Sequence, residues 1–86
     1  SEMCIRDRYD RKKVMQLGSY VERENADLEW KMLQELYPEL RSKTPEVIRT
    51  RINGQIFYRL VLHSESGGFL SLCNRLRGDR VQCLLR

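Results

Sequence analysis

The chain has 86 residues, of which 41% are apolar and 33% charged, with 16 Lys and Arg against 12 Asp and Glu. A chain this short buries only about 60% of the surface that its unfolded state exposes, so we expect one domain with a thin core and no room for a deep catalytic cavity. No apolar run approaches the roughly 20 residues of a membrane span, and the net charge of +4 tolerates an anionic or polar partner without requiring one.

The first residues differ in character from the rest of the chain. Ser1–Arg8 has neither helical nor strand periodicity and resembles a translated sequencing-adapter scar. We therefore expect residues 1–12 to be a non-native or disordered leader and residues 13–86 to form the domain. An export signal or membrane anchor of a parent protein would lie outside this segment.

A strand and a helix are expected to begin the domain. Apolar and polar residues alternate along Val14–Tyr20, which predicts a strand with one apolar face. The next segment has apolar residues at helical spacing and predicts an amphipathic helix that ends near Tyr37, because Pro38 follows. The apolar positions of this helix are Ala26, Trp30, Leu33, Leu36 or Tyr37, and Leu40.

A hairpin follows, with strands over Val47–Arg51 and Gln55–His63 on either side of an Asn-Gly pair. A two-residue Asn-Gly turn would put Arg49 and Arg51 on the same face as Tyr58. A three-residue loop separates the arginines from the apolar residues, and because such segregation sets register, we predict the longer loop. The polar face would then hold Arg49, Arg51, Phe57, Arg59, Val61 and His63.

A short helix and a last strand complete the pattern. Phe69, Leu72, Cys73 and Leu76 form one helical stripe, and Val81–Leu85 alternates as a strand. The order βαββαβ predicts an α+β, ferredoxin-like (RNP-like) fold, in which a four-stranded antiparallel sheet carries two helices on one face. The first and third strands should be central, and the second face should be open to solvent.

This open face is where we expect a ligand to bind. Gln16 and Gly18 should lie beside Phe57 and Arg59, with Arg49 further out. A sugar ring can pack on the aromatic ring, the amide and the guanidinium can bond to its oxygens, and a glycine lets a ligand approach the backbone. The alternative is a solvated arginine face with a phenylalanine that only packs at the edge.

Four short motifs lie in order along the domain: Met15-Gln-Leu-Gly-Ser-Tyr20, Glu24-Asn-Ala26, Phe57-Tyr-Arg-Leu-Val-Leu62, and Leu72-Cys-Asn-Arg-Leu76 followed by Cys83. Together they resemble the SPOR domain family. The resemblance implies non-catalytic binding of peptidoglycan glycan strands stripped of stem peptides, with no cofactor. It also implies a periplasmic or cell-envelope location in bacteria, where the domain targets a larger parent protein to the septum or wall. The implied contacts are Gln16, Ser19, Phe57 and Arg59, although strand alternation alone turns Ser19 inward.

The two cysteines of the domain, Cys73 and Cys83, should lie on facing core surfaces of the last helix and the last strand. Two buried free thiols are one possibility, because cysteine is often buried without bonding. The SPOR resemblance implies a disulfide instead, and an oxidising compartment favours one.

Two other functions are compatible with this topology. An RNA-binding module of the RRM type also uses the open sheet face, but it needs several aromatic residues there and this chain offers Phe57 alone. A generic protein-interaction domain has no signature of its own. We expect a monomeric domain without a nucleic-acid partner or direct membrane insertion. We also expect no metal site and no catalytic residue, because His63 is the single histidine and no base accompanies a Ser or Cys nucleophile.

Overall fold

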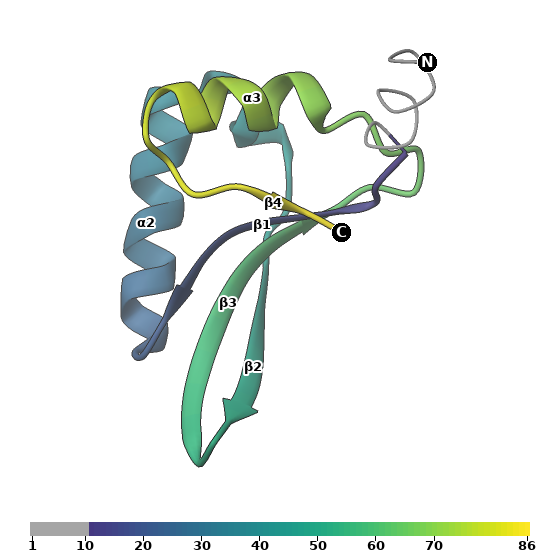
Figure 1. The fold of residues 1–86 in the computed structure, drawn as a ribbon. Helices are drawn as coiled ribbons and strands as arrows, with labels where there is room; N and C mark the ends of the chain where they lie inside the picture. Colours follow the sequence, from purple (N-terminus) through teal and green to yellow (C-terminus); the bar gives the residue numbers. More distant parts are fainter. Residues whose placement is uncertain (1–10) are drawn as a thin grey trace.

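The computed structural model describes residues 11–86, so most of the expected leader lies outside the described residues. The sheet is antiparallel, and its strand order β2-β3-β1-β4 places β1 and β3 at the centre (Figure 1). The predicted α+β, ferredoxin-like arrangement is thus confirmed. The elements are β1 (Val14–Tyr20), α2 (Arg23–Leu36), the 3-10 helix η1 (Pro38–Ser42), β2 (Glu46–Ile52), β3 (Gln55–His63), α3 (Leu70–Gly78) and β4 (Leu84–Leu85).

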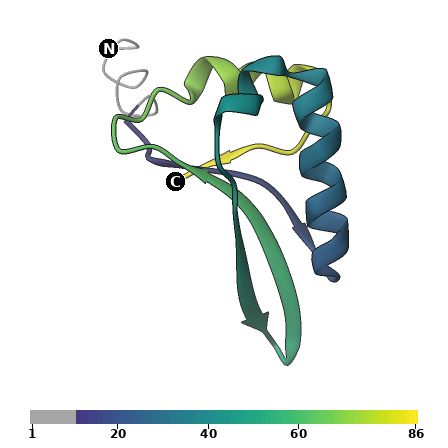
Figure 2. The ribbon, with the colours of Figure 1, turned by 180° about the vertical axis from the view of Figure 1, so that it is seen from behind.

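A single apolar core joins both helices to the central strands. Helix α2 ends at Leu36 because Pro38 follows, and Tyr37 is the residue that turns into the core, whereas Leu36 stays 61% exposed. Figures 1 and 2 show α3 at one end of the molecule and α2 running along its side, while the tip of the β2–β3 hairpin extends beyond both helices. The largest fully buried side chains are Met15, Leu17, Leu33, Leu40, Leu60, Leu62, Leu76 and Cys73.

Strand β1 contains a β-bulge that strand alternation does not predict. Gln16 pairs with Val61 and Gly18 with the adjacent residue Leu60, so Leu17 is the extra residue between them. The extra residue, Leu17, is apolar and 2% exposed, so it packs in the core. Beyond the bulge the alternation is reversed, and Gly18 faces the core side while Ser19 faces the open side.

The predicted register of the β2–β3 hairpin is wrong. Ile52 pairs with Gln55 across a two-residue turn, in which Asn53 has φ 50° and Gly54 has φ 82°. Both angles are positive, as in the turn that Asn-Gly favours, and its twist matches that of the flanking strands. The local turn chemistry prevails because this half of the hairpin extends past the helices, so arginines on the helix side of the sheet remain in water.

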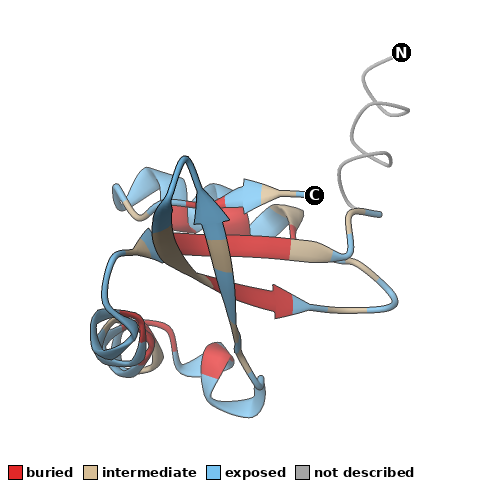
Figure 3. Ribbon diagram, turned by 90° about the horizontal axis from the view of Figure 1, so that it is seen from below, coloured by how far each residue is buried: buried red, intermediate tan, exposed pale blue. Residues whose placement is uncertain are grey.

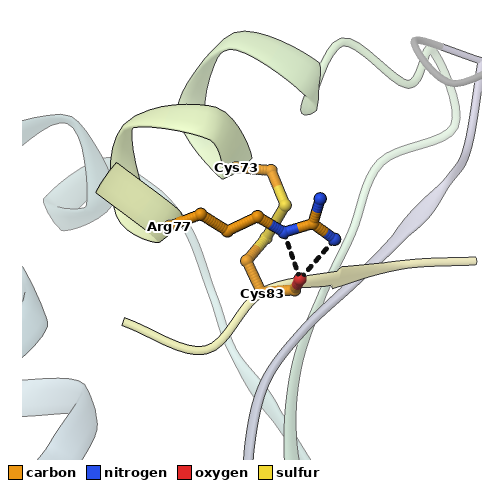
Figure 4. Close-up of a disulfide and its surroundings, with 3 residues drawn as sticks. All are labelled: Cys73, Arg77 and Cys83. Atoms are coloured by element: carbon orange, nitrogen blue, oxygen red, sulfur yellow. Dashed lines mark hydrogen bonds between the residues drawn. A yellow bond between two sulfur atoms is a disulfide. The ribbon is translucent and has the colours of Figure 1, made fainter. Parts of the chain in front are cut away.

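Strand β4 is shorter than predicted and is tied to α3. The chain turns at Arg80, which has φ 64°, and β4 comprises only Leu84–Leu85, after which Arg86 exchanges two backbone hydrogen bonds with Val14 of β1. The carbonyl oxygen of Cys83 instead accepts hydrogen bonds from Nε and Nη2 of Arg77, at 2.9 and 2.7 Å (Figure 4). The Arg77 side chain thus supplies the hydrogen bonds that the Cys83 carbonyl would have received from a neighbouring strand if β4 were longer.

A disulfide joins Cys73 of α3 to Cys83, with the two Cα atoms 5.6 Å apart (Figure 4). Cys73 is 0% and Cys83 3% exposed, so the bond lies within the core. The disulfide that the family resemblance implied is therefore present in the structure, and it fixes the segment before β4 against α3.

Candidate functional site

The candidate site is the sheet face that neither helix covers. Arg59 lies at its centre, since its register partners are Ser19 on β1 and Ile48 on β2. Cross-strand partners share a face, so these three side chains form one row across the open side. Phe57, two residues along β3, lies on the same face and pairs with Thr50. We call Ser19, Ile48, Phe57 and Arg59 the open-face cluster.

The open-face cluster is accessible from solvent. Ser19 is exposed, Ile48 is 43% exposed, and Phe57 and Arg59 are half-buried. Seen from below, the strands change from buried near the helices to half-buried and exposed along the hairpin (Figure 3). Arg59 forms no ion pair among residues 11–86, so its guanidinium is available for an outside acceptor. An apolar surface with one free cation and a hydroxyl suits a ring-shaped polar ligand that carries a carboxylate or carbonyl oxygen.

Gln16 lies on the open face, beside Val61 of β3 and Leu84 of β4. It is 5% exposed, which makes it the one buried polar side chain among the described residues. The sequence predicted an exposed amide here. Gln16 lies between its cross-strand neighbours Val61 and Leu84 and, at this low exposure, offers a ligand little surface.

Gly18 does not face the open side, contrary to the prediction. The bulge at Leu17 turns it to the core side, where a β-carbon would overlap the hydroxyl oxygen of Tyr20 and would lie 2.6 Å from its Cζ. The missing side chain therefore makes room for the Tyr20 ring and not for a ligand. The same bulge explains Ser19, which alternation turned inward and which the structure places on the open face.

Arg49 also lies on the opposite face from the one predicted. Its register partner is Tyr58, and that of Arg51 is Ile56, so both arginines lie on the helix side of the sheet. There Arg49, Arg51 and Ile56 line a hollow of about 390 Å³. The sequence had instead grouped Arg49 with Phe57 and Arg59, and the two-residue turn separates them.

Ile48 is the member of the site that sequence reasoning missed. The wrong register assigned it to the core face, whereas it lies beside Arg59 and is 43% exposed. The signal that could have found it is Asn53-Gly54, the strongest short-range indicator of a two-residue hairpin turn.

Two tyrosines have perturbed acidity, and both lie on the core side. Burial, with a smaller contribution from the charge of Glu29, raises the pKa of Tyr20 to about 12. The hydroxyl of Tyr37 donates a hydrogen bond to Asp79, and this bond is the main reason that the pKa of Tyr37 is raised. These groups stabilise the packing of α2 and are not part of the open-face cluster.

The described part of the chain offers little for catalysis or metal binding. No group of three or more His, Cys, Asp and Glu side chains gathers there. His63, at the end of β3, lies 3.5 Å from a carboxylate oxygen of Glu65, whose other oxygen lies 3.5 Å from Lys13. This arrangement is an exposed charge cluster at a strand end. Within the same residues, no helix combines the length and the apolar character that crossing a membrane requires.

Comparison of the chain with protein-family models, with curated proteins and with solved structures gave no match. The assignment to a family therefore stays a prediction from the sequence motifs, and the function has to be argued from the site.

Proposed function

We propose that this domain binds peptidoglycan glycan strands, without catalysing a reaction, through the open-face cluster. The observation that carries the proposal is the row Ser19–Arg59–Ile48 with Phe57 beside it, on the one sheet face that the helices leave free. The motif resemblance to SPOR domains supports the same ligand class from the sequence.

The chemistry of the cluster fits an amino-sugar polymer. The ring of Phe57 and the side chain of Ile48 offer apolar surface to the faces of pyranose rings. The hydroxyl of Ser19 can donate to or accept from sugar hydroxyl and acetamido groups. The Arg59 guanidinium can bind a carboxylate, which glycan strands expose on the lactyl group once the stem peptide has been removed. Strands that lack stem peptides are thus the expected ligand.

The proposed setting is the bacterial cell envelope, where the domain would direct a larger parent protein to the division septum or the wall. The core disulfide between Cys73 and Cys83 supports this setting, because such bonds persist in oxidising compartments. A cytoplasmic RNA-binding role has less support, since Phe57 is the one aromatic residue of the open-face cluster and RNA modules of this topology stack several bases.

Co-sedimentation with purified sacculi tests the proposal. Sacculi treated with an amidase, which removes stem peptides, should retain more protein than untreated sacculi. Equal retention on both, or no retention on either, would count against the proposal.

A further inference from the structure

Helix α2 has a second apolar side, which faces solvent. Leu28, Met32 and Leu36 follow one another at intervals of four residues and are 63%, 44% and 61% exposed. Residues four apart lie one above the other on a helix, so the three side chains form a continuous ridge about 12 Å long. We call them the α2 ridge. Their side of the helix is distinct from the core side, which carries Ala26, Trp30 and Leu33.

Acidic residues border the α2 ridge. Helix α2 contains four acidic residues and two basic ones, a net charge of −2, in a chain whose net charge is +4. Glu24 precedes Leu28 by one turn and Glu35 follows Met32 by three residues, so both lie beside the ridge. Lys31, three residues after Leu28, is the one basic residue of α2 at the same spacing, so the border has a net negative charge. Both glutamates are exposed and have no ion-pair partner in the part of the chain that the structure describes. The ridge therefore combines apolar surface with unpaired negative charge.

The hollow on the helix side of the hairpin has the opposite character. Its lining residues, Arg49, Arg51 and Ile56, lie on the helix side of the half of the hairpin next to the Asn53-Gly54 turn. Both guanidinium groups are exposed and lack an ion-pair partner within residues 11–86. The aliphatic stems of the arginines and the Ile56 side chain supply apolar surface between the charges. We call this surface the hairpin hollow.

We propose that the α2 ridge of one copy docks into the hairpin hollow of a second copy, and that the domain self-associates head to tail. Apolar side chains meet apolar stems, and Glu24 and Glu35 come near Arg49 and Arg51, so both surfaces gain the partners that they lack in the monomer. The proposed contact differs from the monomeric domain that the sequence leads us to expect. It leaves the open-face cluster free, and it does not depend on the proposed glycan binding.

The charges decide between a head-to-tail contact and a symmetric one. A symmetric dimer through the ridge would bring two helices of net charge −2 together, and one through the hollow would gather four guanidinium groups. Like charges placed opposite each other are unfavourable, whereas the ridge and the hollow are complementary. A head-to-tail contact leaves one ridge and one hollow open at the ends, so it can extend beyond a dimer.

The test uses sedimentation equilibrium of the 86-residue chain and two single-face variants. In one, Leu28→Gln, Met32→Gln and Leu36→Gln remove the ridge while keeping good helix formers. In the other, Arg49→Glu and Arg51→Glu reverse the charge of the hollow. The control variant, Arg11→Glu with Arg86→Glu, makes the same charge change at exposed positions outside both surfaces. Melting temperatures near that of the parent establish that each variant is folded.

We expect the average mass of the parent and of the control variant to rise with concentration, with a dissociation constant of roughly micromolar to millimolar for so small a contact. Each single-face variant alone should remain monomeric. Their equimolar mixture should form a 1:1 dimer that grows no further, because one intact ridge meets one intact hollow. A parent that stays monomeric, single-face variants that associate like the parent, or a mixture that remains monomeric would each overturn the proposal.

Discussion

A β-carbon on Gly18 would overlap the hydroxyl oxygen of Tyr20, an approach closer than real β-carbons make. The two residues face the same side of β1 because alternation resumes after the bulge at Leu17. The ring of Tyr20 fills the space that a side chain at position 18 would take, so the glycine serves packing and not ligand access.

Replacing Gly18 by alanine should therefore destabilise the domain. The added methyl group must displace a half-buried ring, and overpacking of this kind costs roughly 1–3 kcal/mol. Urea denaturation of the parent and of Gly18→Ala measures the difference. Gly78→Ala is the matched control, because no atom lies within 4 Å of its β-carbon site and it ends α3. If both alanine variants had the same stability, the packing role of Gly18 would be wrong.

The sequence allowed the topology to be predicted because periodicity marks each element. The extent of β1, the end of α2 at Leu36 and the hairpin strands follow from alternation, helical spacing and proline. The bulge could not be predicted, because its inserted residue, Leu17, is as apolar as a regular core position. That one insertion moved Gly18 off the open face and moved Ser19 onto it.

The hairpin register differs from the predicted one because neither face of the sheet is covered near the turn. Segregation of charge from apolar residues sets register where one face is buried. At the far end of the hairpin both faces meet water, and Arg49 and Arg51 are exposed on the helix side. There the Asn53-Gly54 turn decides instead. Phe57 and Arg59 were placed correctly, because β3 is a central strand and its alternation is fixed by buried Leu60.

The raised pKa of Tyr20 predicts how the domain responds to alkali. Its pKa rises from 10.0 to about 12 on folding, mainly because burial disfavours the phenolate. The folded state thus holds this proton more tightly than the unfolded state, so the stabilisation is complete below pH 10 and is lost as the pH rises from 10 to about 12.

Ultraviolet titration of tyrosinate in the parent and in Tyr20→Phe gives the Tyr20 curve by difference. Its midpoint should lie near pH 12, and Glu29→Gln should lower that midpoint slightly, since the charge of Glu29 is the smaller cause. A Tyr20 midpoint near pH 10 in the folded protein would contradict the burial of the ring.

The disulfide should stabilise the domain and should be present in protein exported by its native host. The bond closes a loop between residues ten positions apart, and the loss of chain entropy in the unfolded state corresponds to about 2–3 kcal/mol. Intact mass should be two hydrogens below the dithiol form, and Cys73→Ala with Cys83→Ala should unfold at lower urea concentration. Free thiols at both Cys73 and Cys83 in the exported protein would refute this prediction.

The domain should not bind RNA usefully at physiological salt. Phe57 is the one ring of the open-face cluster, Arg59 is its one cation, and stacking and phosphate contacts both need several such groups. A fluorescence titration with mixed-sequence single-stranded RNA checks this expectation. Sub-micromolar affinity at that salt concentration would favour the RRM-type alternative.

Glycan binding should depend on the open-face cluster and not on the other side of the same hairpin. Phe57→Ala removes the apolar surface that would stack on a sugar ring, and Arg59→Gln removes the cation that would bind a carboxylate, so both should reduce retention on amidase-treated sacculi. Arg49→Gln is the matched control, because it removes the same charge from the helix side of the sheet.

Measurements in dilute protein, with melting temperatures near that of the parent, separate loss of binding from self-association or unfolding. Leu60 lies on the core side of the same strand and is 0% exposed, so Leu60→Ala should instead reduce stability, by roughly 2–5 kcal/mol. If Arg49→Gln lost binding as Arg59→Gln did, the ligand would follow net charge and not the open face. If Phe57→Ala and Arg59→Gln both bound as the parent does, the site would lie elsewhere.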